Sequence, residues 1–195
     1  MRASITTLVR LLLVISLPLL LCAGDAAAPT PIGPQKSSIT VRVFKSGVFS
    51  AFGHEHEISA PIQQGSFTEN PASVELMVDA RKMRVMDKDV SEKDRTEIQQ
   101  TMLGPKVLDS EKFPEIRFQS TSVERLGEGK WAILGDLTIR GETRPVKVRV
   151  EGQNGHYRGI VELKQKDFGI TPVTVAGGTV KVKNELRVEF DIVSK

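Results

Sequence analysis

The segment Val180-Lys-Val-Lys-Asn-Glu-Leu-Arg-Val-Glu-Phe-Asp-Ile192 alternates apolar and charged side chains, and Asn184 alone interrupts the apolar row. Successive side chains of a strand point to opposite faces of its sheet. The alternation therefore predicts a strand with one face against a core and the other in water. Antiparallel pairing is favoured, because strands of a parallel sheet are covered on both faces and are apolar throughout.

The same alternation recurs along the chain. One run extends from Trp131 to Ile139, turns through Gly141 and continues from Val146 to Val150, which predicts a β-hairpin. Weaker runs are Ile39 to Lys45, Val48 to Ile58, Gly65 to Thr68, Val74 to Ala80, Glu115 to Arg125 and Tyr157 to Gln165. These runs predict an all-β fold of about eight one-sided strands. Such a sheet hides its apolar face by closing into a barrel or by packing as a sandwich.

One segment departs from this pattern and predicts a short helix between strands. Ser91 and Asp94 have the spacing of a capping box, and Ile98 and Met102 lie one helical turn apart. Gly104, followed by proline, ends the run. We expect this helix to cover one end or one flank of the sheet.

The N-terminus has the layout of a secretory signal peptide: two arginines and no acid before residue 11, an eleven-residue apolar run from Leu11 to Leu21, then small residues. We expect residues 1–26 to be cleaved, residues 27–37 to form a flexible lead-in and residues 38–195 to form one domain. Cleavage would remove Cys22, the single cysteine. The expected location is periplasmic or extracellular.

The charge distribution indicates which classes of partner to expect. The chain has 27 basic and 24 acidic residues, interspersed, with one Trp and one Tyr, which disfavours nucleic-acid binding. Two basic groups suggest peripheral contact with an anionic membrane surface or with a pyrophosphate head group, although such residues more often form the solvent-exposed face of a sheet. They are Arg81, Lys82, Arg84 and Lys88, and Arg140, Arg144, Lys147 and Arg149.

Three motifs occur in an order that resembles the YceI-like family, also called polyisoprenoid-binding proteins. They are Phe113-Pro-Glu-Ile-Arg-Phe-Gln-Ser120, Gly135-Asp-Leu-Thr-Ile-Arg-Gly-Glu-Thr-Arg-Pro-Val146 and Lys166-Asp-Phe-Gly-Ile170. The resemblance covers roughly Ser38 to Val193. It implies an extended, eight-stranded antiparallel β-barrel similar to lipocalins, in exported proteins that hold a long isoprenoid lipid in the barrel. Arg140 stands where many members have His, and the segment with His54 and His56 looks like a subgroup variant.

The apolar row is the candidate binding site. Taken alone, these side chains would be interpreted as a solid core, whereas the resemblance favours a cavity for a polyisoprenoid or quinone-like tail. We expect no catalytic residue and no cofactor. The inward-facing candidates are Val41, Val43, Leu76, Val78, Ile116, Phe118, Trp131, Ile133, Leu137, Val146, Val148, Leu186, Val188 and Phe190.

His54 and His56 are two residues apart, so in a strand both rings project from the same face as Phe52. We count all three among the ligand-contacting candidates. An alternative hypothesis is an envelope protein that binds a metal or haem through the two histidines. Two ligands do not complete a metal site, and no third lies nearby in sequence. Another alternative is a filled barrel with a structural or stress-related role.

Overall fold

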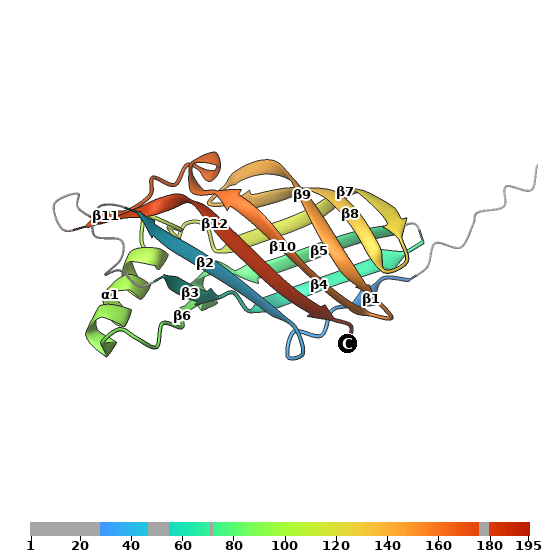
Figure 1. Cartoon of the computed structure of the whole chain (residues 1–195), viewed down its shortest axis with the longest axis horizontal. Helices are drawn as coiled ribbons and strands as arrows, with labels where there is room; N and C mark the ends of the chain where they lie inside the picture. The colour runs from blue at the N-terminus through green and yellow to red at the C-terminus, as the bar shows by residue number, and fades with distance from the viewer. Residues whose placement is uncertain (1–27, 47–54, 71, 176–179) are drawn as a thin grey trace, which may run out of the picture.

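The computed structural model describes residues 28–46, 55–70, 72–175 and 180–195. These residues form one curled, antiparallel sheet with a single α-helix at one end (Figure 1). The strands are β1 (Thr30–Pro31), β2 (Ser38–Ser46), β3 (His56–Ser59), β4 (Ile62–Glu69), β5 (Ala72–Asp79), β6 (Arg84–Val85), β7 (Glu115–Gly127), β8 (Lys130–Ile139), β9 (Glu142–Gln153), β10 (His156–Lys164), β11 (Thr174–Val175) and β12 (Val180–Val193). The helix is α1 (Glu92–Leu103), and two 3₁₀ turns are η2 (Ala80–Lys82) and η3 (Gln165–Phe168).

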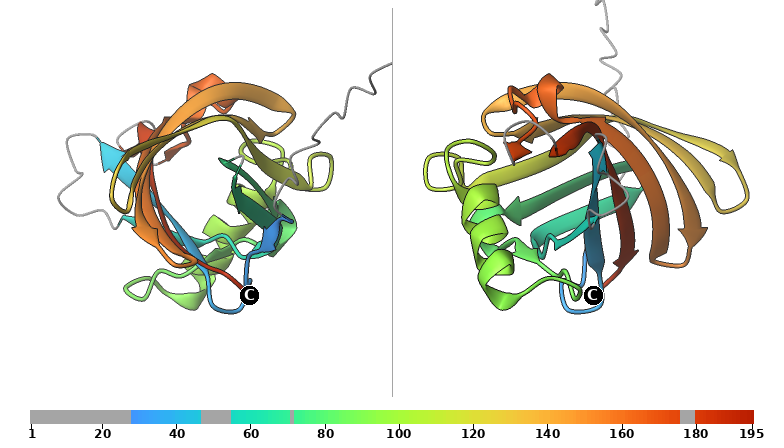
Figure 2. Two further views of the ribbon diagram at one scale, coloured as in Figure 1. Left: turned by 90° about the vertical axis from the view of Figure 1, so that its right-hand side faces the viewer. Right: turned by 60° about the vertical axis from the view of Figure 1, so that its left-hand side comes forward.

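The sheet order is β1-β4-β5-β7-β8-β9-β10-β12-β2-β3-β6, with β11 beside β12. Within the described ranges the two end strands, β1 and β6, do not pair with each other, so the sheet is a half-barrel whose curl is visible end-on in Figure 2. The predicted all-β, antiparallel architecture is confirmed. The predicted closed barrel of eight strands is wrong, because the described residues form 12 strands and the sheet is open between β1 and β6. Strands of two residues, such as β1, β6 and β11, are too short to show an alternation in the sequence.

The strand β12 organises the sheet as its sequence predicts. It pairs with β10 on one side, from His156 opposite Val193 to Lys164 opposite Glu185, and with β2 on the other. The interruption at Asn184 lies where the β2 register shifts between Val182 and Leu186. There the Asn184 Oδ1 accepts a hydrogen bond from the backbone N–H of Lys166, at 3.0 Å. Asn184, the polar residue in the apolar row, therefore lies at an irregularity of β12, and its side chain binds the start of η3.

The predicted hairpin is the pair β8–β9, which is in register from Lys130 opposite Glu151 to Ile139 opposite Glu142. Its two turn residues, Arg140 and Gly141, have φ of 53° and 76°. Positive φ at both central positions is typical of a type I′ turn, whose twist matches that of the flanking strands.

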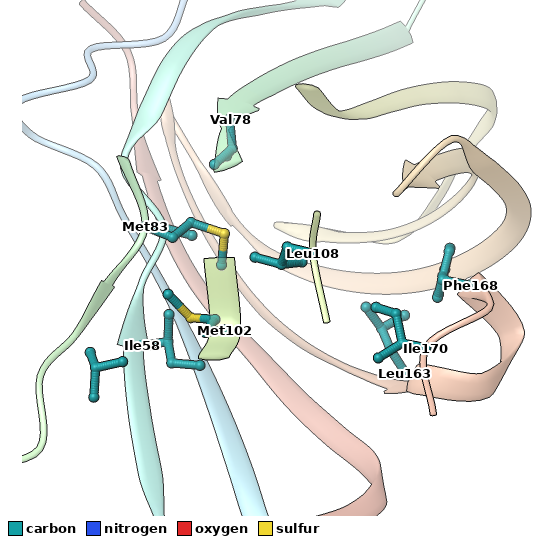
Figure 3. Packing of buried hydrophobic residues seen from close by; sticks show 10 residues of the cluster. Ile58, Val78, Met83, Met102, Leu108, Leu163, Phe168 and Ile170 are labelled. Carbon is teal, nitrogen blue, oxygen red and sulfur yellow. The ribbon is translucent and has the colours of Figure 1, made fainter. Parts of the chain in front are cut away.

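The predicted helix is also confirmed. The Ser91 side chain caps α1 by accepting a hydrogen bond from the backbone N–H of Asp94 at 3.1 Å, and Gly104 follows the last helical residue. The helix lies at one end of the curled sheet (Figures 1 and 2). Its Met102 is buried in the core cluster together with Met83, Leu108 and Phe168 (Figure 3).

Part of the predicted lead-in, residues 27–37, lies in the sheet. Strand β1 pairs with β4, and Ile32 is only 3% exposed. Ile32 also bridges to Ser194, while the backbone N–H of Gly33 donates to the carbonyl of Val193 at 2.8 Å. Residues 30–33 therefore join β4 to the end of β12. The predicted signal peptide lies outside the described residues.

We predict that the β8–β9 turn depends on glycine. Gly141→Ala would place an alanine in a left-handed backbone conformation, with φ of 76°, and its Cβ would lie 2.9 Å from Phe113 Cε1. The free energy of unfolding should therefore fall by about 1–2 kcal/mol. Urea denaturation measures this change. Gly127→Ala is the matched control, because nothing lies within 4 Å of its Cβ position, and it should change stability by less than about 0.5 kcal/mol. Equal effects of the two variants would contradict this account of the turn.

Candidate ligand cavity

A cavity of about 310 Å³ lies inside the curled sheet. Apolar side chains from most of the long strands line it. The predicted site residues among them are Val41, Val43, Leu76, Val78, Ile116, Phe118, Trp131, Ile133, Leu137, Val146, Val148, Leu186, Val188 and Phe190. Strand periodicity alone thus identified side chains that the fold brings together from β2, β5, β7, β8, β9 and β12. Whether they contact a ligand remains a prediction.

The exposure of these side chains shows that the interior is not filled. Val78 and Val148 are buried, at 3% and 8% exposure, but the other twelve face inward and are nevertheless only partly buried. In a close-packed interior such residues would contact neighbours on all sides. The space beside them contradicts the hypothesis of a filled barrel.

Two phenylalanines leave room in the interior because they lie against glycines. A Cβ on Gly135 would approach the Phe118 ring to 2.5 Å, and a Cβ on Gly159 would approach the Phe190 ring to 2.4 Å. Each ring thus occupies the space that a side chain on the neighbouring strand would need. The large aromatic groups therefore cover the sheet and do not cross the cavity.

The end of the cavity near α1 is lined by residues from outside the alternating strands. They include Met83, Met102, Leu108, Phe168 and Ile170, which gather around this end with Leu163 (Figure 3). Sequence reasoning placed Met102 on the helix but did not assign these residues to the site. Apart from Met102, they lie in turns and loops. The apolar residues of turns and loops do not recur at a regular spacing, so the sequence does not show which of them face inward.

The side chain of Gln99 fixes the helix over this end. Its Oε1 accepts a hydrogen bond from the backbone N–H of Val85, and its Nε2 donates to the carbonyl of Met83, both at 2.8 Å. The amide of Gln99 thus pairs with a backbone N–H and a backbone C=O at the edge of β6, as a neighbouring strand would. Gln99 therefore positions Met102 and Met83 together at the cavity end.

At the other end, near β1, the lining includes Phe67 on β4 and Tyr157 on β10. Their rings meet edge to face with centroids 5.3 Å apart. The Tyr157 hydroxyl donates a hydrogen bond to Oε1 of Glu69 at 3.0 Å. Burial, followed by the bond to Glu69, raises the pKa of Tyr157. The sequence did not predict the contact between Phe67 and Tyr157. Their strands, β4 and β10, are not neighbours in the sheet, so no pattern of strand pairing brings the two rings together.

The three candidate residues of the early strand are not shown in the cavity. Phe52 and His54 lie outside the described residues, and His56 does not line the cavity. The Nδ1 of His56 lies 2.6 Å from Oδ2 of Asp87, and the other oxygen of Asp87 accepts the backbone N–H of Glu57 at 2.8 Å. His56 thus contacts a buried carboxylate next to β6.

No group of three or more His, Cys, Asp or Glu side chains suited to a metal ion occurs in the part of the chain that the structure describes. Because His54 lies outside that part, the metal or haem hypothesis is not tested by the structure. His56 itself has a carboxylate partner in Asp87.

Several residues of the two basic groups have structural partners. Arg81 forms two hydrogen bonds to the carboxylate of Asp79, at 2.9 Å each. Arg140 donates to the backbone carbonyls of Gly169 and Pro105, at 2.8 and 2.9 Å. It thereby ties the β8–β9 turn to η3 and to the segment after α1. Membrane contact by these groups remains a prediction.

A family model described as "YceI-like domain" matches residues 31–194. The chain belongs to the YceI-like domain family. The matched range begins inside β1 and reaches past β12, so this YceI-like domain includes Ile32 and Ser194, which bridge the end of β1 to the end of β12.

Relatives of this YceI-like domain include a UPF0312 protein of Vibrio cholerae, which is 31% identical over 140 residues, 64% of this chain and 68% of that protein. A UPF0312 protein of Shewanella denitrificans is 40% identical over 92 residues, 42% of this chain and 48% of that protein. The chain therefore spans about half of the Shewanella protein.

Two solved structures share the fold. BcnA of Burkholderia cenocepacia has a TM-score of 0.61 at 19% identity, with 84% of this chain and 99% of that chain covered. The YCEI protein of Campylobacter jejuni has a TM-score of 0.53 at 12% identity, with 77% and 84% covered. At these identities the likeness shows the fold alone.

We predict an acid-dependent loss of stability at the turn that leads to Met83. Hydrogen bonds from Arg81 hold the pKa of the Asp79 carboxyl below its ordinary value, although burial raises it. The native carboxyl thus binds a proton less readily than the unfolded one, so this stabilisation is complete above the unfolded pKa and is lost as pH falls through the lower native pKa.

Asp79→Asn should lower the free energy of unfolding by about 1–2 kcal/mol at neutral pH. It should also flatten the dependence of stability on pH in the acidic range. Urea unfolding at a series of pH values checks both effects. Glu115→Gln is the control, because Glu115 is exposed and its ion pair with Arg117 is 3.4 Å long. An Asp79→Asn variant that kept the native acid dependence would contradict the assignment.

Proposed function

We propose that this chain binds an elongated apolar molecule, such as a polyisoprenoid or a quinone-like tail, inside its curled sheet. It sequesters or carries this ligand and catalyses no reaction. The observation that supports this most directly is the cavity of about 310 Å³ whose apolar lining is only partly buried. Membership in the YceI-like domain family is consistent with a binding role.

The lining explains why an apolar ligand would be favoured. Most of the residues that line the cavity are Val, Leu, Ile, Met and Phe, with few polar groups. An apolar cavity offers water few hydrogen bonds. The volume lies at the lower end of the roughly 300–1,000 Å³ that small-molecule sites occupy.

Hydrophobic burial alone supplies useful affinity. Each methylene removed from water contributes about 0.8 kcal/mol. Ten such groups contribute about 8 kcal/mol, which equals a Kd of about 1 μM before the cost of association. No catalytic or ionic group is required for such binding.

The cellular setting completes the proposal. A cleaved signal peptide over residues 1–26 would place the domain in the periplasm or outside the cell. Among the described residues no helix has the length and hydropathy needed to cross a membrane. An anionic membrane surface is the proposed site of ligand exchange, with peripheral contact through basic residues on the outer face such as Lys147 and Arg149.

We predict that partly filling the cavity weakens binding. Val146 and Lys147 are neighbours on β9 that face in opposite directions, the first into the cavity and the second into solvent. Val146→Trp should weaken binding of geranylgeraniol by about tenfold or more, as expected for the loss of about two buried methylenes. Displacement of the fluorescent probe N-phenyl-1-naphthylamine measures the affinity.

Lys147→Trp carries the same ring on the outer face and should bind as the native protein does. Circular dichroism and thermal unfolding establish that both variants are folded. Unchanged affinity in a folded Val146→Trp variant would overturn the proposal that the ligand lies in this cavity.

A further inference from the structure

Most polar side chains that line the cavity gather at one end. Thr68, Glu69 and Ser73 lie where the hairpin β4–β5 turns, and Tyr157 faces them from the start of β10. This end lies beside β1, opposite the end that α1 covers (Figure 1). An elongated amphiphile with its tail in the cavity would therefore meet polar groups here.

The geometry of this group makes Glu69 an acceptor. The Tyr157 hydroxyl donates to its Oε1 at 3.0 Å, and the Phe67 ring holds the tyrosine in place by an edge-to-face contact. A tyrosine phenol is protonated at neutral pH, and burial together with the bond to Glu69 raises the pKa of Tyr157 further, so the hydroxyl is a donor. A carboxylate has about four lone-pair positions, and this hydrogen bond uses one of them.

In the described ranges no Lys or Arg forms an ion pair with Glu69, whereas Glu57, Glu115, Glu142, Glu162 and Glu189 each have one. A negative charge at the end of an apolar cavity attracts hydrogen-bond donors and repels anions. Glu69 is exposed at this end, so salt screens both effects and they are strongest at low ionic strength. This carboxylate is therefore the group at this end that distinguishes a hydroxyl from an anionic head group.

We propose that this end of the cavity binds the hydroxyl head group of a neutral long-chain alcohol, which donates a hydrogen bond to Glu69, and that it discriminates against lipids with anionic head groups. This inference rests on the proposed function, because it requires a tail in the cavity. It adds the chemistry of the head group and the direction in which the ligand lies, with its polar end beside β1 and its tail toward α1.

The experiment compares two ligands with the same tail. Hexadecan-1-ol and hexadecanoate are titrated separately against the protein loaded with N-phenyl-1-naphthylamine, at neutral pH and low ionic strength. The native protein should bind the alcohol about tenfold more tightly than the carboxylate, the change expected for one hydrogen bond to a charged group.

Glu69→Gln removes the charge and keeps the shape, and it should bring the two affinities within about twofold of each other, since the repulsion of the carboxylate is lost. Tyr157→Phe should keep the preference for the alcohol, because Glu69 remains charged. Glu75→Gln is the matched control: Glu75 is an exposed carboxylate on β5 that does not line the cavity, so its loss should leave the tenfold preference unchanged.

The outcomes separate this inference from the proposed function. If neither ligand displaces the probe, the proposed function fails. If both bind equally well to the native protein, or if Glu69→Gln keeps the native preference, a tail still enters the cavity but the head-group assignment is overturned. A native preference for hexadecanoate also overturns it, because the polar head would then lie near a cation elsewhere.

Discussion

The structure depends on one constraint: every long strand has a single apolar face, and the sheet must turn that face away from water. Strand β12 pairs with β10 on one side and with β2 on the other over most of its length, so its apolar face fixes which face of these two strands is turned inward. Residues opposite each other in adjacent strands share a face, so the apolar row of β12 continues into Val161 and Val41. Curling the sheet is the way in which a largely helix-free chain covers that surface.

Curling the sheet does not fill it. The inner side chains are mostly of medium size, and the rings of Phe118 and Phe190 lie over glycines. The ends are covered by other means: α1 and the turns around Met83 and Ile170 at one end, and residues 30–33 with Phe67 and Tyr157 at the other. The core therefore consists of two packed ends with a less densely packed middle, which is where the proposed ligand lies.

Much of this arrangement follows from local rules. Alternation predicted the long strands and which of their residues face inward, and the cap at Ser91 and the turn at Gly141 were visible as short motifs. Strand count and closure did not follow, because β1, β6 and β11 owe their existence to partners distant in sequence. The polar group at Glu69 and Tyr157 was not predictable for the same reason: β4 and β10 are not neighbours in the sheet. The histidine pair looked informative, yet His56 contacts Asp87, a residue that no spacing rule connects with it.

The bridge between Ile32 and Ser194 has a consequence for how the molecule is made. The segment around β1 hydrogen-bonds to the C-terminal end of the chain, including the N–H of Lys195 to the carbonyl of Pro31 at 2.9 Å. A nascent chain cannot form these contacts until residues 193–195 have left the ribosome, or the translocation channel if it is exported. This part of the sheet must therefore close late, since contacts of such long sequence separation form slowly. Removal of residues 194 and 195 would leave the pairing of β1 with β4 in place but would expose the side of residues 31–32 that faces the end of β12, and unpaired strand edges promote aggregation.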